Sequence, residues 1–112
     1  MISYSAIADY LPSNSLEFVG TGQVKLNLNQ ITGNSLTLDA SAIEGILKIL
    51  EALALYTDAV NTERAAATPP LAPIEFCEKH LTGTPDAPNF QYVVTASINS
   101  QSFINNVVDP TA

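Results

Sequence analysis

The sequence predicts an α+β domain in which one long helix stands between two β-hairpins. Residues 41–64 repeat their apolar side chains with the period of an α-helix, whereas residues 16–29 and 90–99 alternate apolar and polar side chains. Segments rich in glycine, proline and asparagine separate these runs. Strands before and after one helix favour a mostly antiparallel sheet of about four strands in ββαββ order, with the helix across one face. We expect a single domain over residues 1–112.

The central helix is predicted over residues 41–64. Ser41 and Glu44 have the spacing of a capping box, in which each side chain accepts a hydrogen bond from the other residue's backbone N–H. Pro69 and Pro70 cannot continue a helix. At about 100° per residue, the apolar side chains cover roughly half of the circumference, which is more than one sheet is expected to bury. They form two adjacent lines, one of Ile43, Leu47, Leu50 and Ala54, and the other of Ile46, Ile49, Leu53, Tyr56 and Val60.

The first hairpin is predicted before the helix. Even-numbered residues within 16–29 are apolar or glycine, so this segment is expected to form one long strand, bulged or bent at Gly20 and Gly22. Residues 31–35 contain a Thr-Gly-Asn turn signal, and residues 36–38 are then a short returning strand. We expect the even-numbered side chains to pack against the first apolar line of the helix.

The second hairpin is predicted after the helix and an extended, proline-rich connector over residues 68–73. Its strands are expected at residues 74–81 and 90–99, joined by a loop over residues 82–89 that is rich in turn residues. The inner face of its last strand is expected to consist of Phe90, Tyr92, Val94, Ala96 and Ile98.

Short helices are possible at both ends of the chain. Near the N-terminus, a helix carrying Ile7, Tyr10 and Leu11 is expected to be capped by Ser3 or Ser5 and to stop before the proline at position 12. Near the C-terminus, one helical face would consist of Phe103, Ile104, Val107 and Val108.

The charge of the chain restricts the classes of partner. Its formal net charge is −7, and its four basic residues are scattered, so neither nucleic acid nor an anionic membrane surface is an expected partner. Charged residues within the central helix, among them Glu44, Lys48, Glu51 and Asp58, argue against a membrane span. Cys77 is the single cysteine and excludes an intrachain disulfide. The first residues lack the basic start of a signal peptide, so we expect a cytoplasmic protein.

One cluster of residues invites a chemical interpretation. On a strand, Glu78 and His80 share a face and could be two ligands of a metal, with Asp86 as a third. Cys77 would point to the other face from His80, which makes a poor nucleophile–base pair. The alternative is a solvated strand end. Because no phosphate-binding, nucleophile-elbow or metalloprotease motif is present, we predict no catalytic, cofactor-binding or metal-binding residues.

A row of small residues on the helix predicts self-association. Gly45, Ala52 and Ala59 lie at heptad spacing beside the second apolar line, and Ile49 and Tyr56 flank them. Small residues let a second backbone approach closely, so these five residues are the predicted interface of a homodimer or larger homo-oligomer. The alternative is that a segment of the same chain covers the row.

The predicted function is therefore a non-enzymatic, self-associating structural or protein-interaction domain, with any other protein partner unknown. The alternative is a small-molecule-binding domain with a pocket between the helix and the sheet. A cavity of a few hundred cubic ångströms with converging polar groups would favour the binder. A solid core with an apolar external patch would favour assembly.

Overall fold

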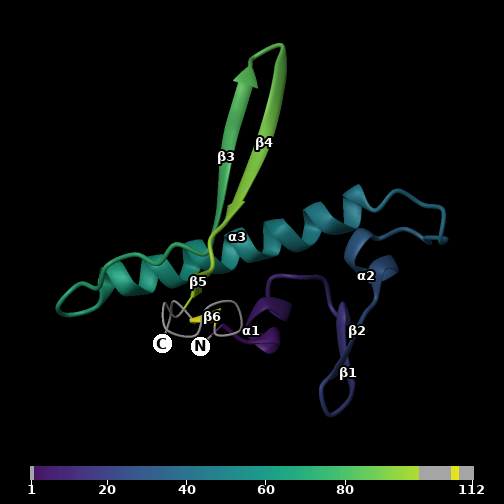
Figure 1. The fold of residues 1–112 in the computed structure, drawn as a ribbon, viewed down its shortest axis with the longest axis horizontal. Helices are drawn as coiled ribbons and strands as arrows, with labels where there is room; N and C mark the ends of the chain where they lie inside the picture. The colour runs from purple at the N-terminus through teal and green to yellow at the C-terminus, as the bar shows by residue number, and fades with distance from the viewer. Residues whose placement is uncertain (1, 99–106, 109–112) are drawn as a thin grey trace.

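The computed structural model describes residues 2–98 and 107–108, and it is built around one long helix from which two hairpins project (Figure 1). The α+β class, the central helix and two antiparallel strand pairs are confirmed, but the ββαββ order is wrong because a further helix follows the first hairpin. The described strands also form three separate two-stranded sheets instead of the single predicted one. In chain order the elements are α1 (Tyr4–Ala8), β1 (Leu16–Gly20), β2 (Gln23–Leu26), α2 (Leu28–Thr32), α3 (Ile43–Ala66), β3 (Cys77–Thr84), β4 (Ala87–Val94), β5 (Ser97–Ile98) and β6 (Val107–Val108).

The long helix α3 has 24 residues and is therefore about 36 Å long. It begins after Ala42, which makes no capping bond through its side chain, so the predicted capping box is wrong. Ser41 Oγ accepts a hydrogen bond from the N–H of Ile43 at 3.3 Å. The Glu44 carboxylate instead accepts one from the side-chain amide of Asn34 at 3.2 Å. Glu44 thus fastens the preceding loop to the helix instead of capping it.

The segment predicted as one long first strand is a complete hairpin. Strands β1 and β2 pair with Leu16 opposite Leu26 and Phe18 opposite Val24, and the two glycines lie at the turn. Gly22 has a φ of 74°, which favours glycine. From Leu16 to Phe18, even-numbered residues of β1 pair with even-numbered residues of β2, and the register then shifts at Gly20, which pairs with Gln23. The even-numbered side chains on the two sides of the turn therefore share one face, as they would in one bent strand. The pattern therefore identified the apolar face correctly and the number of strands wrongly.

The predicted returning strand at residues 36–38 is not a strand. The chain forms the short helix α2 before it, and the turn signal is the end of that helix, where Gly33 has a φ of 75°. Ile31 of α2 is 2% exposed. Gly45 of α3 lies so close to α2 that an added Cβ would be 3.4 Å from Leu28 Cδ2. The helix α2 therefore covers the start of α3.

Residues 67–76 return along α3 as an extended segment, which we call the strap. Two side chains of α3 hydrogen-bond the backbone of the strap. Arg64 Nε donates to the carbonyl of Ala72 (2.7 Å), Asn61 Nδ2 donates to the carbonyl of Ile74 (3.1 Å), and Asn61 Oδ1 accepts from the N–H of Ile74 (2.7 Å). At the end of the strap, Thr57 Oγ1 of α3 accepts a hydrogen bond from the N–H of Cys77, the first residue of β3 (3.2 Å). The strap therefore leads the chain back to the middle of α3, where β3 begins.

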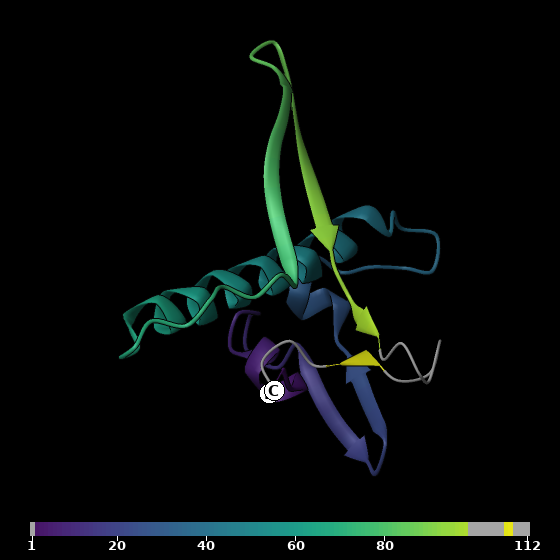
Figure 2. The ribbon, with the colours of Figure 1, turned by 60° about the vertical axis from the view of Figure 1, so that its left-hand side comes forward.

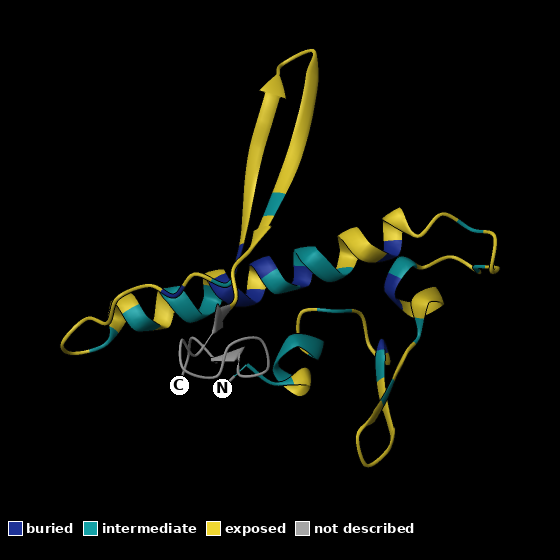
Figure 3. Cartoon of the chain, viewed as in Figure 1, coloured by how far each residue is buried: buried dark blue, intermediate teal, exposed yellow. Residues whose placement is uncertain are grey.

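Strands β3 and β4 form a hairpin of eight residues a side, which we call the arm. Its register runs from Cys77 opposite Val94 to Thr84 opposite Ala87, so the predicted loop at residues 82–89 narrows to a turn at Pro85 and Asp86. Figures 1 and 2 show the arm leaving α3 on the side opposite to β1–β2. Almost all of its residues are exposed (Figure 3).

The core is small and lies along the middle of α3. Its buried apolar residues are Ile31, Ala52, Ala54, Tyr56, Ile74 and Cys77. The prediction that even-numbered strand residues pack on the helix is wrong for Phe18 and Phe90, which are 60% and 63% exposed. The radius of gyration is 16.4 Å, whereas a compact domain of this length has about 13 Å.

A short N-terminal helix is confirmed, but it ends at Ala8, so Tyr10 and Leu11 lie beyond it. The possible C-terminal helix is not found at the positions that the structure describes. Ser3 caps α1 through its side chain, which accepts a hydrogen bond from the N–H of Ala6 at 3.1 Å. Val107 and Val108 form a strand paired with β5, so the predicted helical face is wrong at these positions. Phe103 and Ile104 lie outside the described residues.

Candidate interaction surfaces

The predicted interface residues on α3 lie beneath other parts of the same chain. Gly45, Ala52 and Tyr56 are buried, and Ile49 and Ala59 are half-buried. Helix α2 covers Gly45, because its residues Leu28 and Thr32 lie directly against this glycine. On the α1 side, the ring of Tyr10 packs edge-on against Tyr56 with 6.1 Å between ring centroids.

The row of small residues therefore has the cover that the alternative expected. A contact between two copies through these five residues stays a prediction, but the row no longer provides the exposed apolar strip that motivated it. Exposed apolar side chains lie on the two hairpins, among them Phe18, Leu81 and Phe90. Others lie on α3 outside the row, among them Ile43, Ile46 and Leu47.

The Glu78–His80 pair lies where the strand pattern places it, on one face of the arm. His80 Nε2 is 3.2 Å from Glu78 Oε2, and both side chains are about half exposed. Among the residues that the structure describes, no group of three histidine, cysteine or acidic side chains could hold a metal ion. Cys77 is 1% exposed, and burial raises the pKa of its thiol, with a further increase from the nearby carboxylates of Glu51, Asp58 and Glu78. Such a thiol is a poor nucleophile.

The arm has two chemically different faces. Because paired residues of an antiparallel ladder share a face, Leu81 and Phe90 lie together on one face and His80 and Gln91 on the other. Leu81 is 70% exposed, next to the 63% exposed Phe90. We call the first of these the apolar face of the arm, and its members are Cys77, Lys79, Leu81, Gly83, Pro88, Phe90, Tyr92 and Val94.

The root of the arm is fastened to α3 through Glu51. The Lys79 ammonium lies 2.8 Å from Glu51 Oε2, and the hydroxyl of Tyr92 donates a hydrogen bond of 2.6 Å to the same oxygen. Lys79 also lies 4.3 Å from the centroid of the Phe90 ring. The bonds from Lys79 and Tyr92 lower the pKa of the Glu51 carboxyl, and the same bonds raise the pKa of both partners. This attachment reaches only the inner half of the apolar face.

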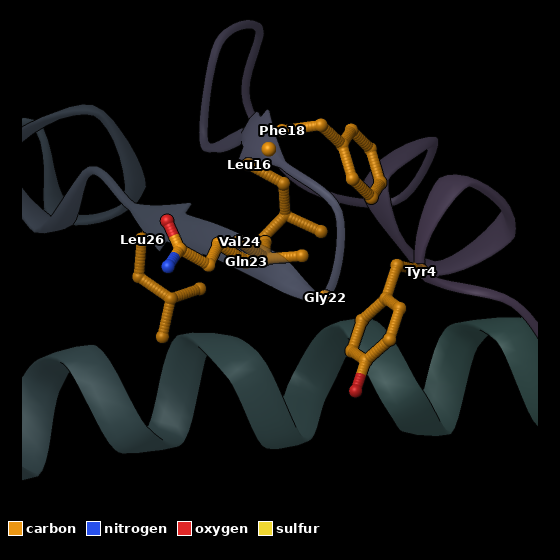
Figure 4. A pocket seen from close by; sticks show the side chains of 8 residues that line it. Tyr4, Leu16, Phe18, Gly22, Gln23, Val24 and Leu26 are labelled. Carbon is orange, nitrogen blue, oxygen red and sulfur yellow. The ribbon is translucent and has the colours of Figure 1, made fainter.

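A groove lies on the apolar face of the β1–β2 hairpin, beside α1 (Figure 4). Its volume is about 570 Å³. It is lined by Tyr4, Leu16, Phe18, Gly20, Gly22, Gln23, Val24 and Leu26. None of these is an acid or a base that is charged at neutral pH. The groove is not the pocket between helix and sheet that the small-molecule alternative expected.

Within the described part of the chain, no helix is both long and apolar enough to cross a membrane. Comparison of the sequence with family models and with curated proteins, and of the structure with solved structures, finds no match.

Proposed function

We propose that this chain is a non-enzymatic, self-associating structural or protein-interaction domain. The observation that supports this most strongly is the amount of surface that one chain leaves in water. Its accessible surface is 8188 Å², whereas a compact monomeric protein of 11.9 kDa exposes roughly 6,000 Å². The excess is about 2,200 Å² per chain, which is within the range that obligate oligomers bury.

The chemistry of the exposed surface supports the same proposal. Large apolar side chains on both hairpins are more than half exposed, among them Phe18, Leu81 and Phe90. A two-stranded hairpin is at best marginally stable alone in water. The outer half of the arm lies beyond its attachment to Glu51, so a partner is the natural source of its remaining stabilisation.

The small-molecule alternative has less support. The groove has a volume in the range of ligand sites, but such sites combine apolar walls with several converging polar groups. Here the side-chain polar groups of the lining residues are the Tyr4 hydroxyl and the Gln23 amide.

The test is the mass of the purified chain in solution, measured by light scattering and by sedimentation over a wide range of concentration. We expect a multiple of 11.9 kDa that falls toward the single-chain mass on dilution. The melting temperature should fall with it, because association stabilises the folded state. A chain that keeps the mass of one copy up to a concentration of about 1 mM would refute the proposal. Association that is still undetected at that concentration would have a dissociation constant weaker than about 1 mM, which is negligible.

A further inference from the structure

Two of the exposed apolar surfaces of the chain, one on the arm and one on the β1–β2 hairpin, differ in shape. The arm presents a narrow projecting face with Leu81 and Phe90, and the β1–β2 hairpin presents a groove lined by Phe18 and Leu26. The hairpins leave α3 on opposite sides, as Figures 1 and 2 both show. The arm of one chain therefore points away from the groove of that same chain.

We propose that the arm of one copy docks into the groove of a second copy, with Phe90 and Leu81 entering between Phe18 and Tyr4. This inference rests on the proposed self-association and specifies the surfaces that carry it. The groove, at about 570 Å³, has room for more than one large side chain. Docking would cover the apolar faces of both hairpins at once and would give each two-stranded sheet the packing that it lacks alone.

The distribution of charge favours this pair of surfaces. Two copies with a formal charge of −7 each repel one another at long range. The outer part of the apolar face consists of Leu81, Gly83, Pro88 and Phe90 and carries no charged side chain. The lining of the groove carries none either. The one charged residue of that face, Lys79, is already paired with Glu51. Contact here therefore brings no unpaired carboxylates together.

The area is also sufficient. Because the arm and the groove are different surfaces, the contact is heterologous, and each copy takes part once through its arm and once through its groove. The excess of about 2,200 Å² sets an upper limit of about 1,100 Å² for each surface, compared with about 800 Å² per partner in a standard stable interface.

The experiment uses two variants with complementary defects. Phe90→Asp places a carboxylate on the arm and leaves the groove intact, whereas Phe18→Asp does the opposite. Each variant alone should associate at least about 30-fold more weakly than the wild type, as expected for loss of a central aromatic anchor. An equimolar mixture should form a 1:1 dimer, because the intact arm of one variant still fits the intact groove of the other.

Matched controls lie one residue away on the other faces. Gln91→Asp, beside Phe90, and Val19→Asp, beside Phe18, should assemble as the wild type does; Gln91 is exposed, Val19 is 52% exposed, and neither lines the groove. Circular dichroism of all variants checks that the fold is retained. Raising the salt concentration to about 0.5 M should leave the contact intact or strengthen it, because screening reduces the repulsion between acidic copies.

A covalent measurement avoids any dependence on the folding of the aspartate variants. Pro88→Cys on the apolar face of the arm and Gln23→Cys in the groove should form a disulfide-linked heterodimer when the two variants are mixed and oxidised. Gln91→Cys, on the polar face, replaces Pro88→Cys as the control. The native Cys77 is buried and should not compete.

The outcomes separate the two proposals. A monomeric wild type would refute self-association itself. A wild type that assembles while Phe18→Asp still assembles with unchanged affinity would leave self-association standing and overturn the contact between arm and groove. A mixture of the aspartate variants that stays monomeric, or cysteine cross-linking no greater than in the control, would overturn it as well.

Discussion

Asn61 is expected to be a main determinant of where the arm leaves the helix. Its side-chain amide pairs with the backbone of Ile74 in the strap through two hydrogen bonds, of 3.1 Å to the carbonyl and 2.7 Å from the N–H. Ile74 is 6% exposed, so water cannot easily replace a lost partner there. We therefore predict that Asn61→Leu destabilises the fold through the strap, although it improves the helix propensity at its own position.

The magnitude follows from the two bonds. Each contributes about 0.5–1.5 kcal/mol, and a backbone group left buried without a partner costs about 1–3 kcal/mol. The expected loss is therefore about 2–4 kcal/mol, against a typical total stability of about 5–15 kcal/mol. With a urea dependence of about 2 kcal/mol per molar, the middle of the usual range, the unfolding midpoint should fall by about 1–2 M.

The assay is urea unfolding followed by far-ultraviolet circular dichroism at one fixed protein concentration, because association shifts apparent stability. Thr62→Leu is the matched control, since Thr62 is the next residue of α3 and is exposed. Its midpoint should change by less than a third of the change in Asn61→Leu. Equal midpoints for the two variants would show that the strap is not held by this side chain and that the reasoning is wrong.

Three further predictions concern single side chains. The Cys77 thiol should react with a disulfide reagent at pH 8 only after unfolding in urea, because burial raises its pKa and blocks access; reaction at the rate of a free thiol in the native protein would contradict this. The folded pKa of Glu51 lies below its ordinary value of 4.5, so its contribution is present above that pH and is lost as the pH falls through the folded value. Glu51→Gln should thus be less stable than wild type at pH 7, by about 0.2–1 kcal/mol for a partly exposed pair, and the difference should disappear in acid unfolding curves. Gly83→Ala should speed hydrogen exchange in the arm, because φ is 86° and the added methyl would clash with the carbonyl of Ala87; Gly22→Ala, which adds a methyl with no neighbour, should perturb its own hairpin less.

The period of the apolar residues predicted the helix well and the strand count poorly. Helix α3 extends from Ile43 to Ala66, close to the predicted residues 41–64, because an amphipathic run of this length has few alternatives. The alternation over residues 16–29 could not distinguish one bent strand from a tight hairpin. The first three pairs of β1–β2 join residues of equal parity, so both arrangements place Phe18 and Val24 on one face. Gly22 at positive φ was the signal for the turn.

Contacts between distant segments decided the rest of the fold. Glu44 was expected to cap its own helix, but its carboxylate accepts a hydrogen bond from Asn34, ten residues earlier. The local sequence does not indicate which of these two bonds forms. Thr57, Asn61 and Arg64 have the spacing of one helical stripe, and their partners are backbone groups of the strap and of Cys77, which no side-chain pattern identifies. Polar side chains on a helix at this spacing, followed by a proline-rich return, are the pattern that would have predicted the strap.

The candidate surfaces were missed because the alternation of a strand indicates an apolar face but not what covers it. Phe90 and Phe18 were assigned correctly to apolar faces and incorrectly to the core. The apolar arc of α3 is covered in part by α2 and by Tyr10, whereas Ile43, Ile46 and Leu47 stay exposed, as do the apolar faces of the hairpins. Which apolar face remains exposed depends on the order in which segments pack, and periodicity does not contain that information.

The contacts that fix the base of the arm to α3 should affect how strongly the arm binds a second copy. Its base is fixed on one side by the strap, through Asn61 and Thr57, and on the other by Glu51, which bonds to Lys79 and Tyr92. These contacts orient the arm before any partner arrives, so docking would order few additional backbone groups and would lose less conformational entropy than docking of a free loop. Weakening the base should then reduce association even when Phe90 and the groove are intact. Asn61→Leu, measured in the same sedimentation experiment under conditions where it remains folded, is expected to associate more weakly than Thr62→Leu; equal association of the two would mean that the orientation of the arm is set by the partner and not by the helix.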